Sequence, residues 1–104
     1  MGNKKYEIRY LSTFISQLNN ILFYITYELK NKIAVDNFYN EVVKQIEIRS
    51  NAPESYEVFK TIQDKQIKYY KINVKNFTIF YVVKENVMEI RRIYYSQRNF
   101  DDLI

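Results

Sequence analysis

Hydrophobic and polar positions change their period along the chain, and each period predicts one kind of element. Residues 6–11 alternate between the two kinds, which predicts a short first strand. Apolar side chains then recur at intervals of three and four, as on one face of a helix. They are Phe14, Ile15, Leu18, Ile21, Leu22, Ile25 and Leu29. The sequence therefore predicts a strand and then one long helix, which Ser12 or Thr13 can cap.

A second helix is expected directly after the first. Asn31 interrupts the first helical pattern and can cap the next helix. One face of this second helix carries Val35, Phe38, Val42, Ile46 and Arg49. The pattern ends before Pro53, because the residue that precedes a proline is disfavoured in a helix. Since the connection is short, the two helices are predicted to form an antiparallel hairpin.

The last third of the chain predicts three strands. Three runs are rich in β-branched and aromatic residues, and they span residues 67–74, 77–84 and 87–95. Only two residues separate each run from the next, as in a tight hairpin turn, so the three strands should form an antiparallel meander. With one glycine in the chain, we expect asparagines to supply the left-handed backbone in the turns, at Asn31, Asn51, Asn76 and Asn86.

The final strand contains an irregularity. Met88 and Ile90 share a face, but the next aliphatic residue, Ile93, is one position out of step. A β-bulge near Arg91 or Arg92 would restore the alternation. Alternatively, Arg92 lays its methylene groups over an aromatic ring and no bulge is needed.

The order of elements is β-α-α-β-β-β, an α+β fold in which the helix hairpin packs on a small antiparallel sheet. Residues 54–66 fit either a short helical turn or an irregular loop, and Phe100, Leu103 and Ile104 suggest a short C-terminal helix or packed tail. A length of 104 residues corresponds to a single domain, residues 1–104.

The composition excludes several kinds of chemistry. The chain has no cysteine and no histidine, so disulfides, thiolate metal sites and histidine-based catalysis are ruled out. We therefore expect neither a metal nor another cofactor. The N-terminus has no apolar signal-peptide core, and no run approaches the roughly 18 apolar residues of a membrane span. We expect a cytoplasmic protein that does not enter a membrane.

Positive charge is concentrated in the C-terminal part. Residues 1–59 carry seven basic and seven acidic side chains, whereas residues 60–104 carry nine basic and five acidic ones. The net charge of +4 therefore creates a positive potential in the predicted meander, which suits RNA, the ribosome or an acidic protein. Lysines on strands also protect sheet edges, and charge alone does not distinguish the two roles.

Several segments match a known pattern in the correct order. Residues 21–46 resemble the helical hairpin of the RelE/ParE toxin superfamily, and Pro53 falls where that hairpin ends. Residues 75–83 are similar to the family's central strand "N-Y-R-I-x-Y", and residues 89–99 to its terminal "L-R-I-x-H/Y-x-R-R-D". The resemblance covers nearly the entire chain.

The resemblance implies a toxin of a bacterial type II toxin–antitoxin module. Toxins of the RelE-like branch cleave mRNA in the ribosomal A site, and those of the ParE-like branch poison DNA gyrase. Both are inactivated by an antitoxin whose flexible segment wraps the toxin. The implied partners are therefore a cognate acidic antitoxin, in a hetero-oligomer, and either gyrase or the ribosome with its mRNA.

RNA cleavage needs a base for the attacking hydroxyl, a cation for the transition state and an acid for the leaving oxygen. The resemblance places Tyr95 at the family's His or Tyr position and Arg98 at the second arginine, and these two are the candidate catalytic residues. A tyrosine base, with a pKa of about 10, needs cations beside it. The sequence also departs from the pattern, since Thr78 and Gln97 replace two expected arginines.

The remaining basic residues of the meander are candidates for binding the target or RNA. They are Lys68, Lys71, Arg91 and Arg92, of which Arg92 matches the arginine of "L-R-I". Lys68 or Lys71 could replace the missing central arginine, and strand alternation places Lys71 on the face of Tyr69. A purely structural alternative is that Tyr95 is a half-buried sheet aromatic.

Three functions remain open from the sequence, and the first of them is preferred. A ParE-like toxin that inhibits gyrase or another protein by binding is favoured by the arginine missing at Thr78 and by the absence of histidine. A RelE-like endoribonuclease is favoured by Tyr95, Arg98 and the basic meander. The third possibility is a non-toxic binding module with the same fold.

Overall fold

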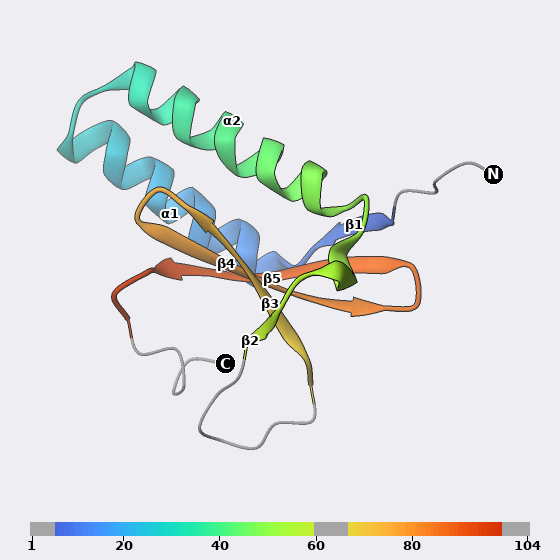
Figure 1. The fold of residues 1–104 in the computed structure, drawn as a ribbon. Coiled ribbons are helices and arrows are strands. Elements are labelled where there is room, and N and C mark those ends of the chain that lie inside the picture. The colour runs from blue at the N-terminus through green and yellow to red at the C-terminus, as the bar shows by residue number, and fades with distance from the viewer. Residues whose placement is uncertain (1–5, 60–66, 99–104) are drawn as a thin grey trace.

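The chain forms two layers, a helical hairpin on one face of a five-stranded sheet (Figure 1). The computed structural model describes residues 6–59 and 67–98. The first half consists of β1 (Glu7–Tyr10), α1 (Ser12–Glu28) and α2 (Lys32–Arg49). A 3-10 turn, η1 (Pro53–Ser55), is followed by β2 (Val58–Phe59), β3 (Tyr69–Val74), β4 (Phe77–Lys84) and β5 (Val87–Tyr95). The predicted α+β fold is confirmed, and the predicted C-terminal helix or tail lies outside the described residues.

The sheet has the order β1-β5-β4-β3-β2. Strands β3, β4 and β5 form the predicted antiparallel meander, and β1 pairs with β5 in parallel. Parallel strands require a long crossover, and the helix hairpin lies within the connection from β1 to β5. The two-residue strand β2 lies in residues 54–66, where a short helical turn or an irregular loop was predicted.

The two helices begin in different ways. Asn31 caps α2 as predicted, because its Oδ1 accepts a hydrogen bond from the backbone N–H of Ala34 at 3.0 Å. The predicted cap of α1 by Ser12 or Thr13 is wrong, since Leu11 is the N-cap residue and no side chain caps this helix. The N–H of Leu11 donates to the carbonyl of Ile90 on β5, so sheet pairing fixes where α1 starts.

Residues other than the expected asparagines adopt the left-handed backbone conformation. Lys75 and Glu85, the first residues of the two hairpin turns, each have φ of 56°, and Lys30 has φ of 49° before α2. An asparagine follows each of these three residues, but no asparagine in the described part of the chain has a positive φ. The expectation that asparagine supplies these conformations is therefore wrong. A left-handed residue other than glycine costs roughly 1–2 kcal/mol.

The bulge predicted in the last strand is confirmed at Arg91. Phe80 lies opposite Arg92 while Tyr81 lies opposite Ile90, so Arg91 is the additional residue on β5. Beyond Ile90, α1 covers the edge of β5 that β1 leaves uncovered. The Oε1 atom of Gln17 on α1 accepts a hydrogen bond from the backbone N–H of Ile93 at 2.9 Å.

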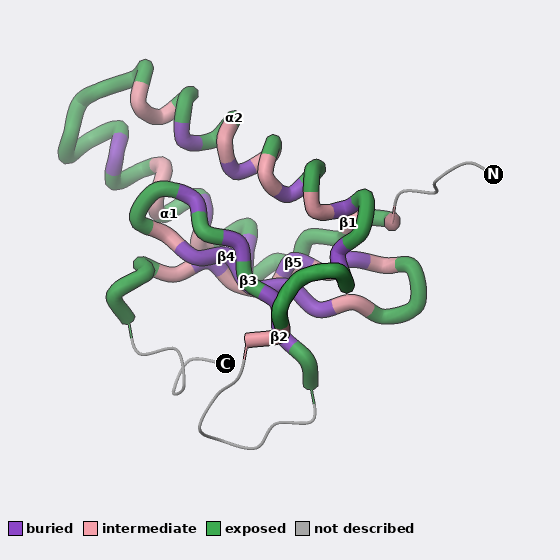
Figure 2. The backbone as a smooth tube through the Cα atoms, viewed as in Figure 1, coloured by how far each residue is buried: buried purple, intermediate pink, exposed green. Residues whose placement is uncertain are grey.

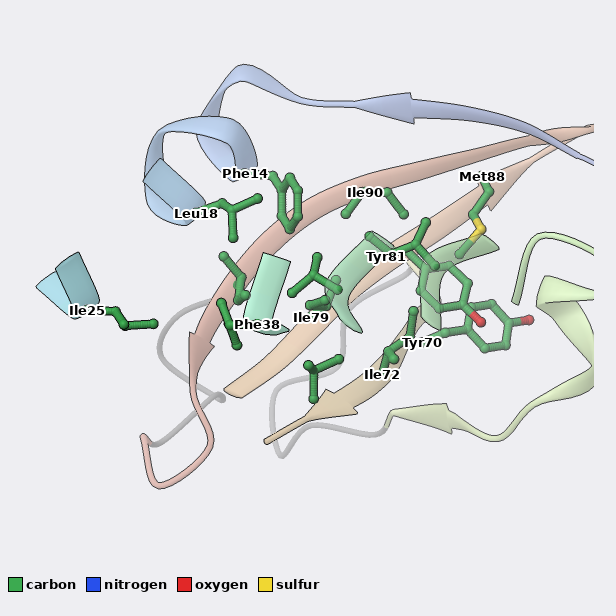
Figure 3. Close-up of a cluster of buried hydrophobic side chains, with 14 residues drawn as sticks. Phe14, Leu18, Ile25, Phe38, Tyr70, Ile72, Ile79, Tyr81, Met88 and Ile90 are labelled. Atoms are coloured by element: carbon green, nitrogen blue, oxygen red, sulfur yellow. The ribbon is translucent and has the colours of Figure 1, made fainter. Parts of the chain in front are cut away.

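The main core lies between the helices and one face of the sheet, where the side chains of the two layers point toward each other (Figure 3). The helices contribute Phe14, Leu18, Ile25, Phe38, Val42 and Ile46, and the sheet contributes Tyr70, Ile72, Val74, Ile79, Tyr81, Met88, Ile90 and Ile93. Buried positions follow one side of each helix and mostly alternate along β3 and β5, whereas residues 78–82 of β4, which is covered on both faces, are all buried (Figure 2). The face of the second helix agrees with the sequence pattern, but two residues expected on the apolar face of the first helix, Ile15 and Leu29, are 47% and 57% exposed.

A smaller cluster covers part of the opposite side of the sheet, which we call the open face. Tyr69, Phe80 and Val82 are buried there, with Phe59 and Tyr94 packed against them. No helix in the described part of the chain is both long enough and apolar enough to cross a membrane.

Candidate functional site

The open face collects most of the predicted binding residues. Arg91 is held most tightly: its Nη1 donates to the Tyr69 hydroxyl at 3.2 Å, and its Nε donates to Glu89 Oε1 at 3.0 Å. The bulge allows Arg91 to reach across β4 to Tyr69 on β3. Burial lowers the pKa of Arg91, but the bonds to Tyr69 and Glu89 raise it, and the net change is upward. Arg91 therefore joins β5 to β3.

The other cations on this face are more accessible. Arg92 is half-buried, and its Nη1 donates to the carbonyl of Arg91 at 2.9 Å. Arg98 is exposed, with its guanidinium carbon 5.8 Å from the centre of the Tyr94 ring. Lys71 is also exposed, and its Nζ lies 5.4 Å from the centre of the Phe59 ring. The structure thus brings three of these predicted cations onto a face lined by aromatic rings.

Lys68 and Tyr95 are placed elsewhere. Lys68 is exposed and precedes the first residue of β3. The side chain of Tyr95 turns to the helix side of the sheet, where its ring centre lies 5.5 Å from that of Phe77. Tyr94, its neighbour on β5, packs on the open face with Phe80. Strand alternation therefore separates the Tyr95 side chain from Arg92 and from the ring that Arg98 contacts.

Thr78 lies at the central-strand position where the family pattern has an arginine. Its side chain is 1% exposed, and its Oγ1 donates to Asn73 Oδ1 at 3.0 Å. The same Oγ1 is 2.9 Å from Ser96 Oγ. These three residues form a polar strip from β3 across β4 to the end of β5, in which the buried Thr78 hydroxyl has a hydrogen-bond partner on each side. Neutral groups therefore occupy the position where the family pattern has a phosphate-binding arginine.

An apolar groove lies on the helix side of the sheet, beside the helix hairpin. Its volume is about 690 Å³, and it lies between the ends of α1 and α2 and the turn from β3 to β4. Its lining includes Tyr24, Ile25, Phe38, Lys75, Phe77 and Tyr95. Exposed apolar side chains at its rim, with Tyr24 at 55% and Leu29 at 57%, indicate a surface suited to a partner.

One polar cluster was not anticipated as a site. Arg49, at the end of α2, donates from Nη1 to the Tyr81 hydroxyl at 3.1 Å, and this hydroxyl donates to the Pro53 carbonyl at 2.8 Å. The guanidinium carbon of Arg49 lies 3.6 Å from the centre of the Tyr56 ring. Burial raises the pKa of Tyr81, although Arg49 acts to lower it. The only signal in the sequence was an arginine on the apolar face of α2.

Metal ligands are not grouped in the described structure. Residues 6–59 and 67–98 contain no cluster of three or more His, Cys, Asp or Glu side chains that could hold a metal ion.

Two solved structures share this two-layer fold. The first, described as a chromosomal ParDE TA system from P. aeruginosa, has a TM-score of 0.72 and 12% identity and covers 89% of this chain and 98% of its own. The second is an archaeal RelE-RelB complex from Pyrococcus horikoshii OT3, with a TM-score of 0.61 and 15% identity. The alignment covers 92% of this chain and 100% of the chain in that structure.

A comparison with protein-family models identifies the family more specifically than the fold does. The model of the ParE toxin of the type II toxin–antitoxin system parDE matches residues 8–100. The chain therefore belongs to the ParE toxin family, and the predicted membership of the RelE/ParE superfamily is confirmed. No curated protein matches the sequence significantly.

Proposed function

We propose that this ParE-family toxin arrests growth by binding and inhibiting DNA gyrase, without cleaving mRNA. The polar strip at Thr78 is the observation that carries this proposal. A ribonuclease needs a preorganised cation at the scissile phosphate, and such a donor is typically worth ~10²–10³ in rate. At Thr78 the sheet instead holds a buried hydroxyl that is bonded to Asn73 and Ser96.

The placement of the candidate catalytic residues supports the same conclusion. General acid–base catalysis requires the base and the stabilising cation to reach one substrate. Tyr95 lies on the helix side of the sheet, whereas Arg92 lies on the open face and Arg98 contacts Tyr94 there. The geometry of these residues therefore favours recognition of a partner by Arg92 and Arg98.

A second candidate function is ribosome-dependent cleavage of mRNA, as in the RelE-like branch. The observation in its favour is the set of exposed or half-buried cations on the open face, Lys71, Arg92 and Arg98, beside aromatic rings. Arginine matches the geometry of phosphate, and aromatic rings stack on bases. Both targets are cytoplasmic, so either function implies that the protein acts in the cytoplasm.

We also propose that an acidic antitoxin neutralises the toxin as part of a hetero-oligomer. The groove of about 690 Å³ offers an apolar floor with Lys75 at its rim. An amphipathic segment that folds on binding could place its apolar side chains in the groove and its acidic ones beside Lys75. The titles of the two similar structures name a ParDE system and a RelE-RelB complex, which supports this kind of partner.

The deciding experiment is controlled induction of the chain in a bacterial host. We expect growth arrest, with a DNA-damage reporter responding before any ribosome-phased mRNA cleavage, and rescue by the co-expressed antitoxin. Purified toxin should inhibit supercoiling by gyrase. A Lys44→Ala variant, altered at an exposed position on α2, serves as the control and should behave like the parent.

Two results would contradict the proposal. Early mRNA cleavage without a DNA-damage response would show that the protein is a RelE-like endoribonuclease instead. Normal growth during strong induction of folded protein would instead support a non-toxic binding module.

A further inference from the structure

The outer edge of β3 is only partly covered by β2. Strand β2 pairs Phe59 with Tyr69 and Val58 with Tyr70, whereas β3 continues to Val74. In the described part of the chain no strand pairs with the outer edge of residues 71–74. An edge of this kind presents backbone N–H and C=O groups to which another strand can bond. The sheet can therefore be extended at this position.

A polar slot lies directly beside this edge. Its volume is about 320 Å³, and its lining includes Arg49, Tyr56, Glu57, Phe59, Lys71 and Asn73. The lining thus contains two cations and one carboxylate, and the aromatic rings form the apolar part of the wall. The slot and the edge share Lys71 and Asn73, so a segment bound along β3 would run through the slot.

The cations of the slot are already oriented. The hydroxyl of Tyr81 and the ring of Tyr56 hold the guanidinium of Arg49, and the ring of Phe59 lies beside the ammonium of Lys71. A side chain that is fixed before binding loses less conformational entropy when its partner arrives. Arginine also matches a carboxylate with two N–H groups at once. The slot is therefore preorganised for acidic groups.

We infer that an extended, acidic segment of a partner protein docks on residues 71–74 of β3 as an additional strand, with its carboxylates at Arg49 and Lys71. Backbone hydrogen bonds supply affinity in this mode of recognition, and the side-chain pockets supply specificity. A nucleic acid brings phosphates but no amide groups, so it would leave the β3 edge unpaired. In a toxin the natural source of such a segment is the antitoxin. The identity of the partner therefore rests on the proposed function, whereas the chemistry of the slot does not.

A labelled peptide tests the strand and the charge separately. The probe is an eight-residue peptide of glutamate and valine with glutamates at both odd and even positions, so that carboxylates lie on both faces of the added strand, toward Arg49 and toward Lys71. It is titrated with the full chain and followed by fluorescence anisotropy. Two matched peptides serve as controls, one N-methylated at alternate residues and one with lysine in place of glutamate. We expect the unmethylated acidic peptide to bind, and each control to bind at least about tenfold more weakly.

Variants of the slot provide the second arm. Lys71→Glu should weaken binding of the acidic peptide about tenfold, and Glu57→Gln should strengthen it, because both alter the charge that the peptide meets. Lys44→Glu makes the same change in net charge at an exposed position on α2 and should have little effect. Lys71 and Glu57 are themselves exposed, so folding should be preserved.

Three outcomes would overturn the inference: no binding of the acidic peptide, equal binding of its N-methylated form, or equal effects of Lys71→Glu and Lys44→Glu. None of them would contradict gyrase inhibition, which is measured without the peptide. If Lys71→Glu binds the purified antitoxin more weakly than Lys44→Glu does, the segment belongs to the antitoxin. If the two variants bind the antitoxin equally while the peptide test succeeds, the slot binds another acidic protein.

Discussion

Arg49, the last residue of α2, donates a hydrogen bond to the hydroxyl of Tyr81 in the middle of β4, and the two atoms are 3.1 Å apart. The Tyr81 hydroxyl in turn donates to the carbonyl of Pro53. One buried hydroxyl thereby joins the helix layer, the sheet and the segment that leads to β2. The same contact orients Arg49 in the slot beside β3.

Removal of this hydroxyl should therefore reduce stability. Tyr81→Phe deletes both hydrogen bonds at a residue that is 0% exposed, and we expect the free energy of unfolding to fall by about 1–3 kcal/mol. Urea denaturation measures the change. Tyr24→Phe, at a residue that is 55% exposed, is the matched control and should change stability by less than about 0.5 kcal/mol. Equal stabilities of the two variants would disprove a structural role for the hydroxyl.

Alkaline pH should destabilise the fold through its buried tyrosines. Burial raises the pKa of both Tyr70 and Tyr81 above the ordinary value of 10.0. The folded state therefore favours the neutral phenol. Its contribution to stability is complete below pH 10 and is lost as the pH rises through the folded pKa values.

Urea denaturation between pH 8 and pH 11.5 checks this dependence. The free energy of unfolding should begin to fall near pH 10, and the slope should be smaller in Tyr81→Phe than in the parent. Lysines also titrate in this range, so the difference between parent and variant is the informative quantity. Identical slopes would show that the Tyr81 phenol does not contribute.

Gln17 should stabilise the bulged half of β5. Gln17→Ala leaves the N–H of Ile93, a residue 2% exposed, without its acceptor, and we expect a loss of about 1–3 kcal/mol. Gln17→Glu keeps an acceptor oxygen of similar reach and should lose less. The two variants are compared by urea denaturation, and equal losses would indicate that packing rather than the hydrogen bond matters.

Arg91 and Arg98 should affect different properties. Arg91→Ala removes the partner of Glu89, whose side chain is 13% exposed, so stability should fall by about 1–3 kcal/mol. Arg98→Ala changes an exposed residue and should leave stability within about 0.5 kcal/mol of the parent while weakening growth arrest. Thermal unfolding and induction assays separate the two effects. A stable but inactive Arg91→Ala variant would instead place Arg91 in target recognition.

Tyr95→Phe distinguishes binding from cleavage. A catalytic hydroxyl typically contributes ~10²–10⁴ in rate, so its loss would abolish toxicity of an mRNA nuclease. Under the binding function we expect Tyr95→Phe to arrest growth as strongly as the parent, because the ring still packs on Phe77. If Tyr95→Phe and Arg98→Ala both leave toxicity intact, neither residue belongs to the functional site.

The sequence by itself determined the elements whose signal is local. Periods of 3.6 and 2 identified both helices and the meander, and the bounds of β4 and β5 coincide with the predicted ones. Asn31 could be identified as the cap of α2 because a capping side chain bonds to a backbone N–H only three residues further along the chain. The bulge at Arg91 was visible because one extra residue shifts every later side chain by one face.

Only the tertiary structure decided how distant residues combine. The parallel pairing of β1 with β5, the start of α1 at Leu11 and the bond between Arg49 and Tyr81 all join residues far apart in the chain. The sequence pattern likewise grouped Tyr95 with Arg98, whereas the pleat of β5 turned Tyr95 toward the helices and left Tyr94 on the open face beside Arg98. Local periodicity describes the faces of each element, but only packing determines which faces meet.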